Sequence, residues 1–565
     1  MYNLRGFMKD MEVLPQSLVL ENRGGAKWWI LLAVALFLVL FLPWVLSNRE
    51  LFRQEGLFAA IASECLEDGG VLTHGLSASA HHVVVDDAFL LYPLVVSLVC
   101  RLGIPMEMAL RLVSLFSLGI LSLLVGICAA SRSNLRAGVI ASCCCFGTLF
   151  AFDKAQIGGP EVMAGCFLFA AQMLFFHYGS RLADWNSAWI SAAILLTLGF
   201  LTAGLVVVLF FAVPLVFLRR PLSSAGKFRV PGFVAGVVLL LLVMISWGLP
   251  TELALRNYAA ESGFKAVELK EYLKELLIFP AMFPVRMLPW VLLMWMPFCV
   301  ALQAISPLPV FSLYLRTLFF SMLALTWLLP GVSTPHMFFL IGPLAVLTGI
   351  YYDLGIRRYG RKLRKVLTFC GILFPLAGMY VAAVYWLPPE YLRFFVDPDK
   401  VLFRNGGDQV YTAVISLICL AVLLGLLHLG VQKFPVWVNL VWLNLLTAIV
   451  GAAVLLPYHS QNQEWRDFGG SVKKDLPDDA AMIYKYNIQG LYNGLFYAGV
   501  PVYKIRKEDP LPDKKTVYVL SPDYPDLPNR SWEPLRREGY ICRGEKVFLW
   551  KGVPVRDEFD GAGNE

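Results

Sequence analysis

The chain has 565 residues, of which 58% are hydrophobic and only 16% are charged, with a formal net charge of +7. Its apolar residues fall in blocks of about 17 to 25, which is the length of helix that crosses a bilayer. The Lys and Arg residues form short clusters between these blocks, where membrane topology accounts for them. The composition therefore predicts a polytopic membrane protein and argues against a partner such as nucleic acid.

The apolar blocks predict a mainly α fold with about 13 transmembrane helices. These are expected at 28–46, 108–130, 136–152, 160–178, 188–202, 205–218, 230–249, 287–302, 310–329, 336–352, 367–387, 410–430 and 436–456. The LTAG stretch at 201–204 predicts a break between two short helices, because glycine interrupts a helix.

The apolar segment Ala88–Cys100 is short for a span and decides the topology. If it lies flat on the membrane, every basic cluster falls in an inside loop, as the positive-inside rule requires. If it crosses, all later loops change sides. We therefore expect a multi-pass protein of the inner (plasma) membrane, with a cytoplasmic amino terminus and a periplasmic or extracellular carboxyl terminus.

Three domains are expected from these patterns. Residues 1–27 form a cytoplasmic segment, and 28–457 form the transmembrane domain with an external loop at 48–107. From residue 458 to 565 the composition is that of a soluble protein, and a small external α/β domain is expected. Its predicted strands are AAMIYKY, PVYKI, TVYVLSP and KVFLWKG, and its predicted helices are IQGLYNGLFYAG and WEPLRREG.

Two acidic residues stand at predicted outer ends of apolar helices. Glu55 begins an amphipathic helix after the first span, and Glu161 follows the Gly-Gly-Pro turn before the fourth. A carboxylate in the first turn of a helix is favoured by the helix dipole, which is a purely structural explanation. Two acids facing one external cavity would instead suit general-base or metal-assisted transfer.

Other ionisable residues of the predicted outer face are candidates for substrate binding. Asp86 and Asp87 end the sequence HHVVVDD, whose spacing matches no strong metal motif. Lys154, Arg286 and His336 lie at outer ends of predicted spans. Each of these three either holds an anionic substrate or reaches towards the membrane interface with its polar end.

Several stretches in the same order resemble the lipid-dependent membrane glycosyltransferases of the GT-C fold, which include the aminoarabinose transferases and the protein O-mannosyltransferases. QEGLFAAIA at 54–62 is similar to the family's first external loop, where an Asp-Glu pair precedes an amphipathic helix. Further similar stretches are AFLLYPLVVSLVCRLG, FDKAQIGGPEVMAG, TLGFLTAGLV and STPHMFFLIGPLAVLTG.

The resemblance implies transfer of a sugar from a polyprenyl-phosphate donor to a hydroxyl of a lipid, glycan or protein acceptor. It implies that the first-loop acid, here Glu55, is catalytic, with Glu161 in support, and that cations hold the phosphate. This sequence departs from the family at Gln54, which replaces the leading Asp. It also lacks two of the family's phosphate-holding Lys residues, one near Asp87 and Ala88 and one at Ala203, and the candidates to replace them are Lys154, Arg286 and His336.

These departures leave two alternatives open. One is that a divalent metal, held by some of Glu55, Asp86, Asp87 and Glu161, takes the place of the missing cations. The other is that the chain binds or flips lipid-phosphate sugars without transferring them. The leading expectation from the sequence is a glycosyltransferase of the cell envelope, acting in lipopolysaccharide or glycan modification.

Overall fold

The structure is a computed structural model that describes residues 23–47, 49–67, 91–218, 228–248, 269–329, 335–386, 434–450 and 464–554, apart from single residues and short breaks within them. The chain divides into two compact units. The helical unit comprises Met1–Ser47, Arg111–Ile245 and Gly263–Tyr458, and the mixed unit comprises Asn48–Leu110, Ser246–Ser262 and His459–Glu565. The first predicted external loop thus groups with the carboxyl-terminal part of the chain.

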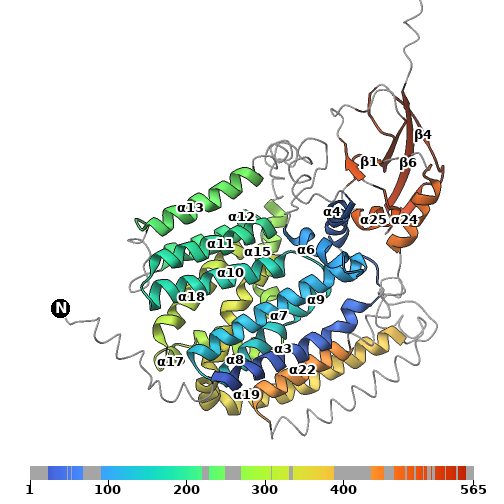
Figure 1. Cartoon of the computed structure of the whole chain (residues 1–565). Coiled ribbons are helices and arrows are strands. Elements are labelled where there is room, and N and C mark those ends of the chain that lie inside the picture. Colours follow the sequence, from blue (N-terminus) through green and yellow to red (C-terminus); the bar gives the residue numbers. More distant parts are fainter. Residues whose placement is uncertain are drawn as a thin grey trace, which may run out of the picture. The chain divides into compact units, whose positions relative to one another are not determined.

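Long apolar helices make up the helical unit (Figure 1). Its main helices are α3 (Arg23–Leu46), α7 (Met106–Arg132), α8 (Leu135–Phe146), α9 (Leu149–Gln156), α10 (Glu161–Phe176), α11 (Trp185–Ala203), α12 (Leu205–Phe217), α13 (Pro231–Val243), α15 (Leu269–Arg286), α18 (Pro309–Leu328), α19 (Ile341–Trp386) and α22 (Val436–Val450). Among the described residues, six helices are long and apolar enough to cross a membrane, or up to eight if each bent pair is one span. An integral membrane protein with a mainly helical fold is therefore confirmed, whereas the predicted number of thirteen spans is not.

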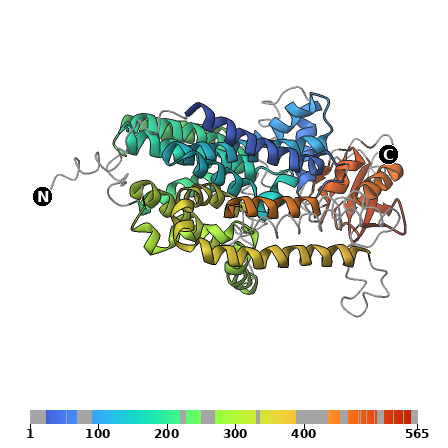
Figure 2. The same cartoon turned by 90° about the horizontal axis from the view of Figure 1, so that it is seen from below.

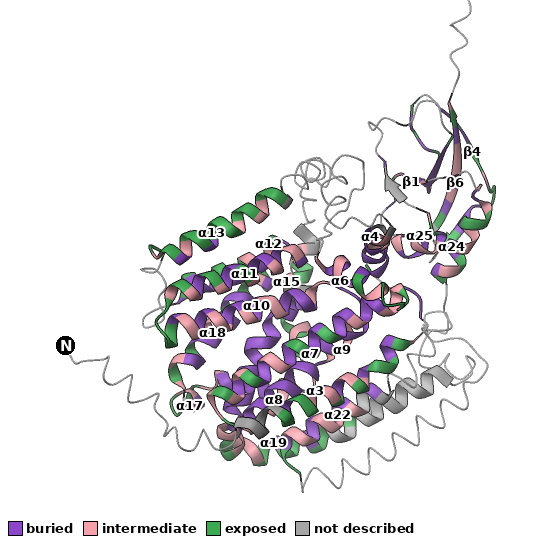
Figure 3. Ribbon diagram, viewed as in Figure 1, coloured by how far each residue is buried: buried purple, intermediate pink, exposed green. Residues whose placement is uncertain are grey.

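Helices of this unit differ in how far they are buried, depending on whether other helices surround them. Figure 3 shows α8 and α10 largely buried, whereas α13 is largely exposed. Apolar side chains on exposed faces, such as Val238 and Leu242, are what a lipid-facing helix requires. The helices of the core are packed through aromatic rings, for example Phe175 against Trp189 and Phe211.

Two breaks in the helices are produced by glycine. Gly204 has a φ of 76° and separates α11 from α12, as the LTAG stretch predicted. Gly147 ends α8, and Thr148 then caps α9 by accepting a hydrogen bond from Ala151 N–H at 3.1 Å. The predicted span 136–152 is therefore two helices that meet at an angle of 58°.

Two loop predictions were wrong in the helical unit. The basic stretch 357–365 was expected to be a loop between two spans, but it continues the 46-residue helix α19 seen in Figure 2. Arg and Lys are good helix formers, and this stretch contains no proline. The stretch 250–286 between the predicted spans 230–249 and 287–302 was expected to be an external loop, but its end forms the helix α15. The predicted span 287–302 is divided into three short helices, α16 (Val291–Met294), η4 (Met296–Phe298) and α17 (Val300–Gln303). The predicted span 410–430 lies outside the described residues.

The mixed unit combines two helices of the first loop with a small α/β domain. The loop helices are α4 (Glu55–Glu67) and α6 (Leu91–Cys100), and the ten residues of α6 are too few for a span. The helices of the small domain are α24 (Glu464–Asp475) and α25 (Tyr492–Ala498). Its strands are β1 (Ile483–Lys485), β2 (Val502–Lys504), β3 (Val517–Ser521), β4 (Arg530–Pro534), β5 (Tyr540–Cys542) and β6 (Glu545–Pro554).

The sheet of this domain has the order β2-β1-β3-β6-β4, and β5 also pairs with β6. β1 runs parallel to β2 and β3, while β6 runs antiparallel to β3 and β4. The predicted helix WEPLRREG is wrong, because its first residues belong to β4. There Trp532 is buried opposite Gly552 of β6, and this strand pairing outweighs local helix preference.

Candidate functional site

Four of the predicted site residues, Lys154, Glu161, Arg286 and His336, lie at ends of helices in the helical unit. The first two form an ion pair: the Nζ of Lys154, in the last turn of α9, lies 3.0 Å from Oε1 of Glu161, the first residue of α10. Their side chains are only 12% and 15% exposed. A charged group at such burial needs a partner, and each of these two side chains supplies one for the other and holds it in place.

The turn before Glu161 is fixed from α7. Ser114 Oγ accepts a hydrogen bond from Gly159 N–H at 3.0 Å and donates one to the Gly159 carbonyl at 3.1 Å. A side chain at Gly159 would collide with the Glu161 carboxylate. The Gly-Gly-Pro turn is therefore shaped so that the carboxylate can bend towards Lys154.

Arg286 and His336, at the ends of two other elements of the helical unit, each contact aromatic rings. The Arg286 guanidinium stands over the ring of Phe150, 5.0 Å from its centroid, and Nη1 lies 3.8 Å from the sulfur of Met337. Phe150 is one helical turn from Lys154 on the same face of α9. His336 is the second residue of the 3₁₀ helix η5 (Pro335–Leu340), and its ring stacks on that of Phe210 with the ring centroids 6.2 Å apart.

Arg111 is a functional candidate that our sequence analysis missed. It is fully buried in α7, and its Nη1 donates to the Ser47 carbonyl at 3.5 Å. It lies three residues before Ser114, so both point to the same face of α7 as the Gly159 turn. The signal was present in the sequence, because an arginine inside an apolar helix is costly and is a functional candidate by default.

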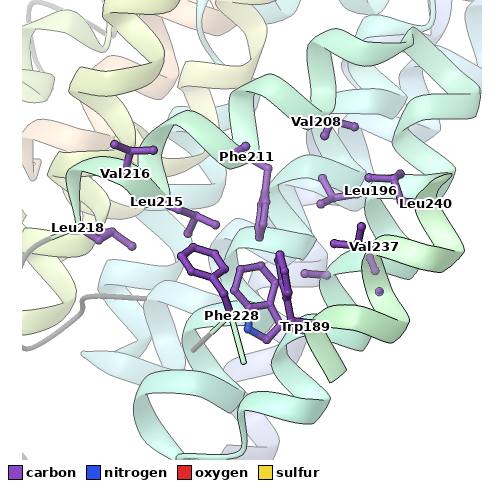
Figure 4. Close-up of a pocket in the computed structure, with 15 residues that line it drawn as sticks. Trp189, Leu196, Val208, Phe211, Leu215, Val216, Leu218, Phe228, Val237 and Leu240 are labelled. Atoms are coloured by element: carbon purple, nitrogen blue, oxygen red, sulfur yellow. The ribbon is translucent and has the colours of Figure 1, made fainter. Parts of the chain in front are cut away.

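The helical unit also contains a largely apolar groove, shown in Figure 4, which lacks the charged side chains of the residues described above. It lies among α11, α12 and α13 and has a volume of about 560 Å³. Trp189, Phe211, Phe228 and Phe233 line it together with aliphatic side chains. This lining suits a hydrocarbon chain and contains no charged residue, so the groove does not provide the chemistry of a reacting group.

Glu55 belongs to the mixed unit and is completely buried. Its Oε2 accepts a hydrogen bond from Phe52 N–H at 2.8 Å, at the start of α4. The neighbouring Gln54 is exposed. A carboxylate offers about four acceptor positions, so the bond to Phe52 does not exhaust its capacity.

Asp86 and Asp87 lie outside the described residues, as do His81 and His82. Within the described part of the chain, no three His, Cys, Asp or Glu side chains come together as metal ligands. Glu161 is engaged by Lys154, which competes with a cation for the same carboxylate. The described residues thus do not form a divalent-metal site.

Comparisons with known proteins place this arrangement in a known fold. The structure of ArnT from Cupriavidus metallidurans bound to undecaprenyl phosphate aligns with a TM-score of 0.62, over 95% of this chain and 100% of that chain. This chain has the fold of ArnT. The apo structure of the same protein gives a TM-score of 0.61 over 94% of this chain and 98% of that chain. Both alignments have 17% sequence identity.

No family model matches the chain, and no curated protein matches it by sequence. The similarity to ArnT therefore establishes a GT-C membrane glycosyltransferase fold, as the sequence patterns predicted. The roles of the individual residues have to be argued from their own geometry.

Proposed function

We propose that this chain is a glycosyltransferase that moves a sugar from a polyprenyl-phosphate donor to an acceptor hydroxyl at the outer face of the inner membrane. The observation that carries the proposal is that Lys154, Arg286 and His336 all stand at helix ends of the helical unit, with Lys154 held by Glu161. Cationic and hydrogen-bonding groups at the boundary of an apolar helix bundle match a ligand with a phosphate head and a hydrocarbon tail. The ArnT structure of the same fold contains such a ligand, undecaprenyl phosphate.

The proposed reaction is a single displacement. The acceptor oxygen forms a bond to the anomeric carbon, while the bond between that carbon and the phosphate oxygen breaks. The phosphate leaves with the bonding electron pair, and the acceptor proton passes to a carboxylate. Charge thus develops on the phosphate, where fixed cations stabilise it most effectively.

Each residue has a distinct part in this proposal. Lys154 and Arg286 bind the phosphate, and His336 donates a further hydrogen bond. Glu161 holds the Lys154 ammonium in position through their 3.0 Å contact. Glu55 accepts the proton of the acceptor hydroxyl, from a buried position at the start of α4 that its hydrogen bond with Phe52 N–H helps to fix.

A second function is favoured by one observation at the first loop. The family's leading Asp is replaced by exposed Gln54, and the remaining acid, Glu55, is bonded to the backbone of Phe52. If the Glu55 carboxylate only accepts this hydrogen bond, its role is to stabilise the start of α4 and not to accept a proton. The chain would then bind or flip a lipid-phosphate sugar without transferring the sugar.

Transfer of radiolabelled sugar separates the two functions. Purified protein in vesicles is supplied with a panel of polyprenyl-phosphate sugars and a cell-envelope fraction as the acceptor. We expect label in the acceptor with at least one donor, and reduced donor affinity for Arg286→Ala. Arg132→Ala is the matched control, since Arg132 also lies over phenylalanine rings, 5.1 Å from that of Phe176 and 5.0 Å from that of Phe311. Donor binding without transfer for the whole panel would establish the second function.

A further inference from the structure

The carboxyl-terminal domain holds the first-loop segment on both sides of Glu55. On the amino-terminal side, Tyr497 of α25 accepts a hydrogen bond from Leu51 N–H at 2.9 Å. On the other side, Asn493 Oδ1 accepts one from Gly56 N–H at 2.7 Å. The donors are backbone groups four residues before and one residue after Glu55. The position of the backbone around this carboxylate is therefore fixed from α25.

Gly56 allows the two helices to approach closely. An added Cβ at this position would collide with the backbone of Asn493. Both residues are buried, so the hydrogen bond between them is sheltered from water. No larger residue at position 56 is compatible with this spacing of α4 and α25.

Further contacts extend this attachment to α24. Glu50 is 7% exposed, and its Oε2 accepts a hydrogen bond from Trp465 N–H at 2.7 Å, in the first turn of α24. Arg466 pairs with Glu107 at 3.3 Å and lies over the Tyr497 ring, 5.4 Å from its centroid. Together, α24 and α25 hold the segment before α4 through buried or half-buried polar groups.

We propose that the carboxyl-terminal domain is a positioning element for Glu55, with Asn493 and Tyr497 as its positioning residues. This inference rests on the proposed function, in which Glu55 accepts the proton of the acceptor. The two hydrogen bonds bracket Glu55, so loss of either allows its carboxylate to shift with the start of α4. Displacements of about 1 Å at a reacting group cost on the order of 100-fold in rate. The domain therefore acts on turnover through the backbone of the first loop.

The test compares kinetic constants in the full-length protein. Asn493→Ala removes the acceptor of the Gly56 bond, whereas Asn493→Asp keeps an oxygen in the same place. Tyr497→Phe removes the acceptor of the Leu51 bond. Tyr540→Phe is the matched control, because its hydroxyl donates to Asp475 at 2.7 Å within the same domain but contacts no residue of the first loop in the described structure.

We expect kcat to fall about 10-fold in Asn493→Ala and Tyr497→Phe, with KM for the lipid donor changed less than about 2-fold. Asn493→Asp should recover most of kcat, and Tyr540→Phe should keep it. In a Glu55→Gln background the Asn493→Ala change should have no further effect. Unchanged kcat in both positioning variants would overturn the inference. An equal loss in Tyr540→Phe would also overturn it, because the effect would then be general destabilisation of the domain.

The proposed function fails in a different way. If Glu55→Gln transfers sugar at the native rate, Glu55 is not the proton acceptor. If Glu55→Gln is inactive but Asn493→Ala and Tyr497→Phe are fully active, Glu55 keeps its role and only the positioning inference is wrong.

Discussion

The two regions that carry the candidate residues differ in how they hold charge. In the helical unit, Lys154 and Glu161 are paired and partly exposed at helix ends. In the mixed unit, Glu55 is completely buried and bonded to backbone N–H. The first arrangement suits binding of an anionic group that arrives from outside, whereas the second suits a carboxylate whose position must not change. In our proposal, binding and proton transfer are thus provided by different parts of the chain.

The largest effect is expected from removing both cations of the helical unit. Lys154→Ala combined with Arg286→Ala should lower affinity for polyprenyl phosphate by at least about 100-fold, because each charge-assisted contact contributes on the order of 1.5–3 kcal/mol. Binding of fluorescent polyprenyl phosphate to protein in nanodiscs measures this. The double variant Arg132→Ala with Arg361→Ala removes the same charge elsewhere on the helical unit. Equal affinity in the two double variants would contradict the phosphate site.

A smaller effect is expected from widening the contact between α4 and α25. Gly56→Ala should lower kcat by about 10-fold or more, since the added Cβ forces the two helices apart. Polyprenyl-phosphate affinity should stay native, because the proposed cations lie in the helical unit. Gly470→Ala is a suitable control, as a Cβ there would contact nothing within 4 Å. Native turnover in Gly56→Ala would show that the close approach is unimportant for activity.

The ion pair offers an intermediate test of the helical unit. Glu161→Gln removes the carboxylate charge but keeps a hydrogen-bonding group beside Lys154. Donor affinity should change by a factor of about 3 to 10, because Lys154 loses its fixed position while the cation remains. Glu161→Ala should have the larger effect of the two. If neither variant alters donor affinity, Glu161 only stabilises the first turn of α10.

The smallest effect concerns alkaline pH. Burial raises the pKa of Tyr497 from 10.0 to about 12. Because the folded-state pKa is the higher one, the stabilisation from this hydroxyl is complete below about pH 10 and is lost as pH rises through about 12. Tyr497→Phe should lack this part of the alkaline loss in thermal melts, whereas the contribution of Tyr540, whose pKa burial also raises, should remain. If the native protein and Tyr497→Phe lose thermal stability identically at alkaline pH, the contribution assigned to the Tyr497 hydroxyl is contradicted.

Much of the helical unit could be predicted from apolar periodicity and glycine. The break at Gly204 and the positions of Lys154, Glu161 and His336 at helix ends followed from local patterns. The continuous helix through 357–365 did not, because a basic cluster marks a membrane boundary by its charge and carries no information on whether the helix ends there. Arg111 was overlooked for a different reason, since one charge hardly lowers the hydropathy of a long apolar block.

The attachment of α4 to α25 could not be predicted at all. It depends on Gly56 and Asn493, which are more than four hundred positions apart, and their local sequences contain no sign of pairing. The sequence predicted an amphipathic helix at this place, and Phe58, Ala62 and Cys65 form the buried apolar stripe of α4. Which elements pack against that stripe, however, depends on the folded chain and cannot be read from the local sequence.

The most direct test measures donor binding and sugar transfer together in the native protein and in Glu55→Gln. We expect Glu55→Gln to bind the polyprenyl-phosphate sugar with native affinity and to transfer the sugar at least about 100-fold more slowly. Native transfer by Glu55→Gln would contradict the role of this carboxylate. Binding without transfer by the native protein, for every donor, would contradict the central claim that the chain is a glycosyltransferase.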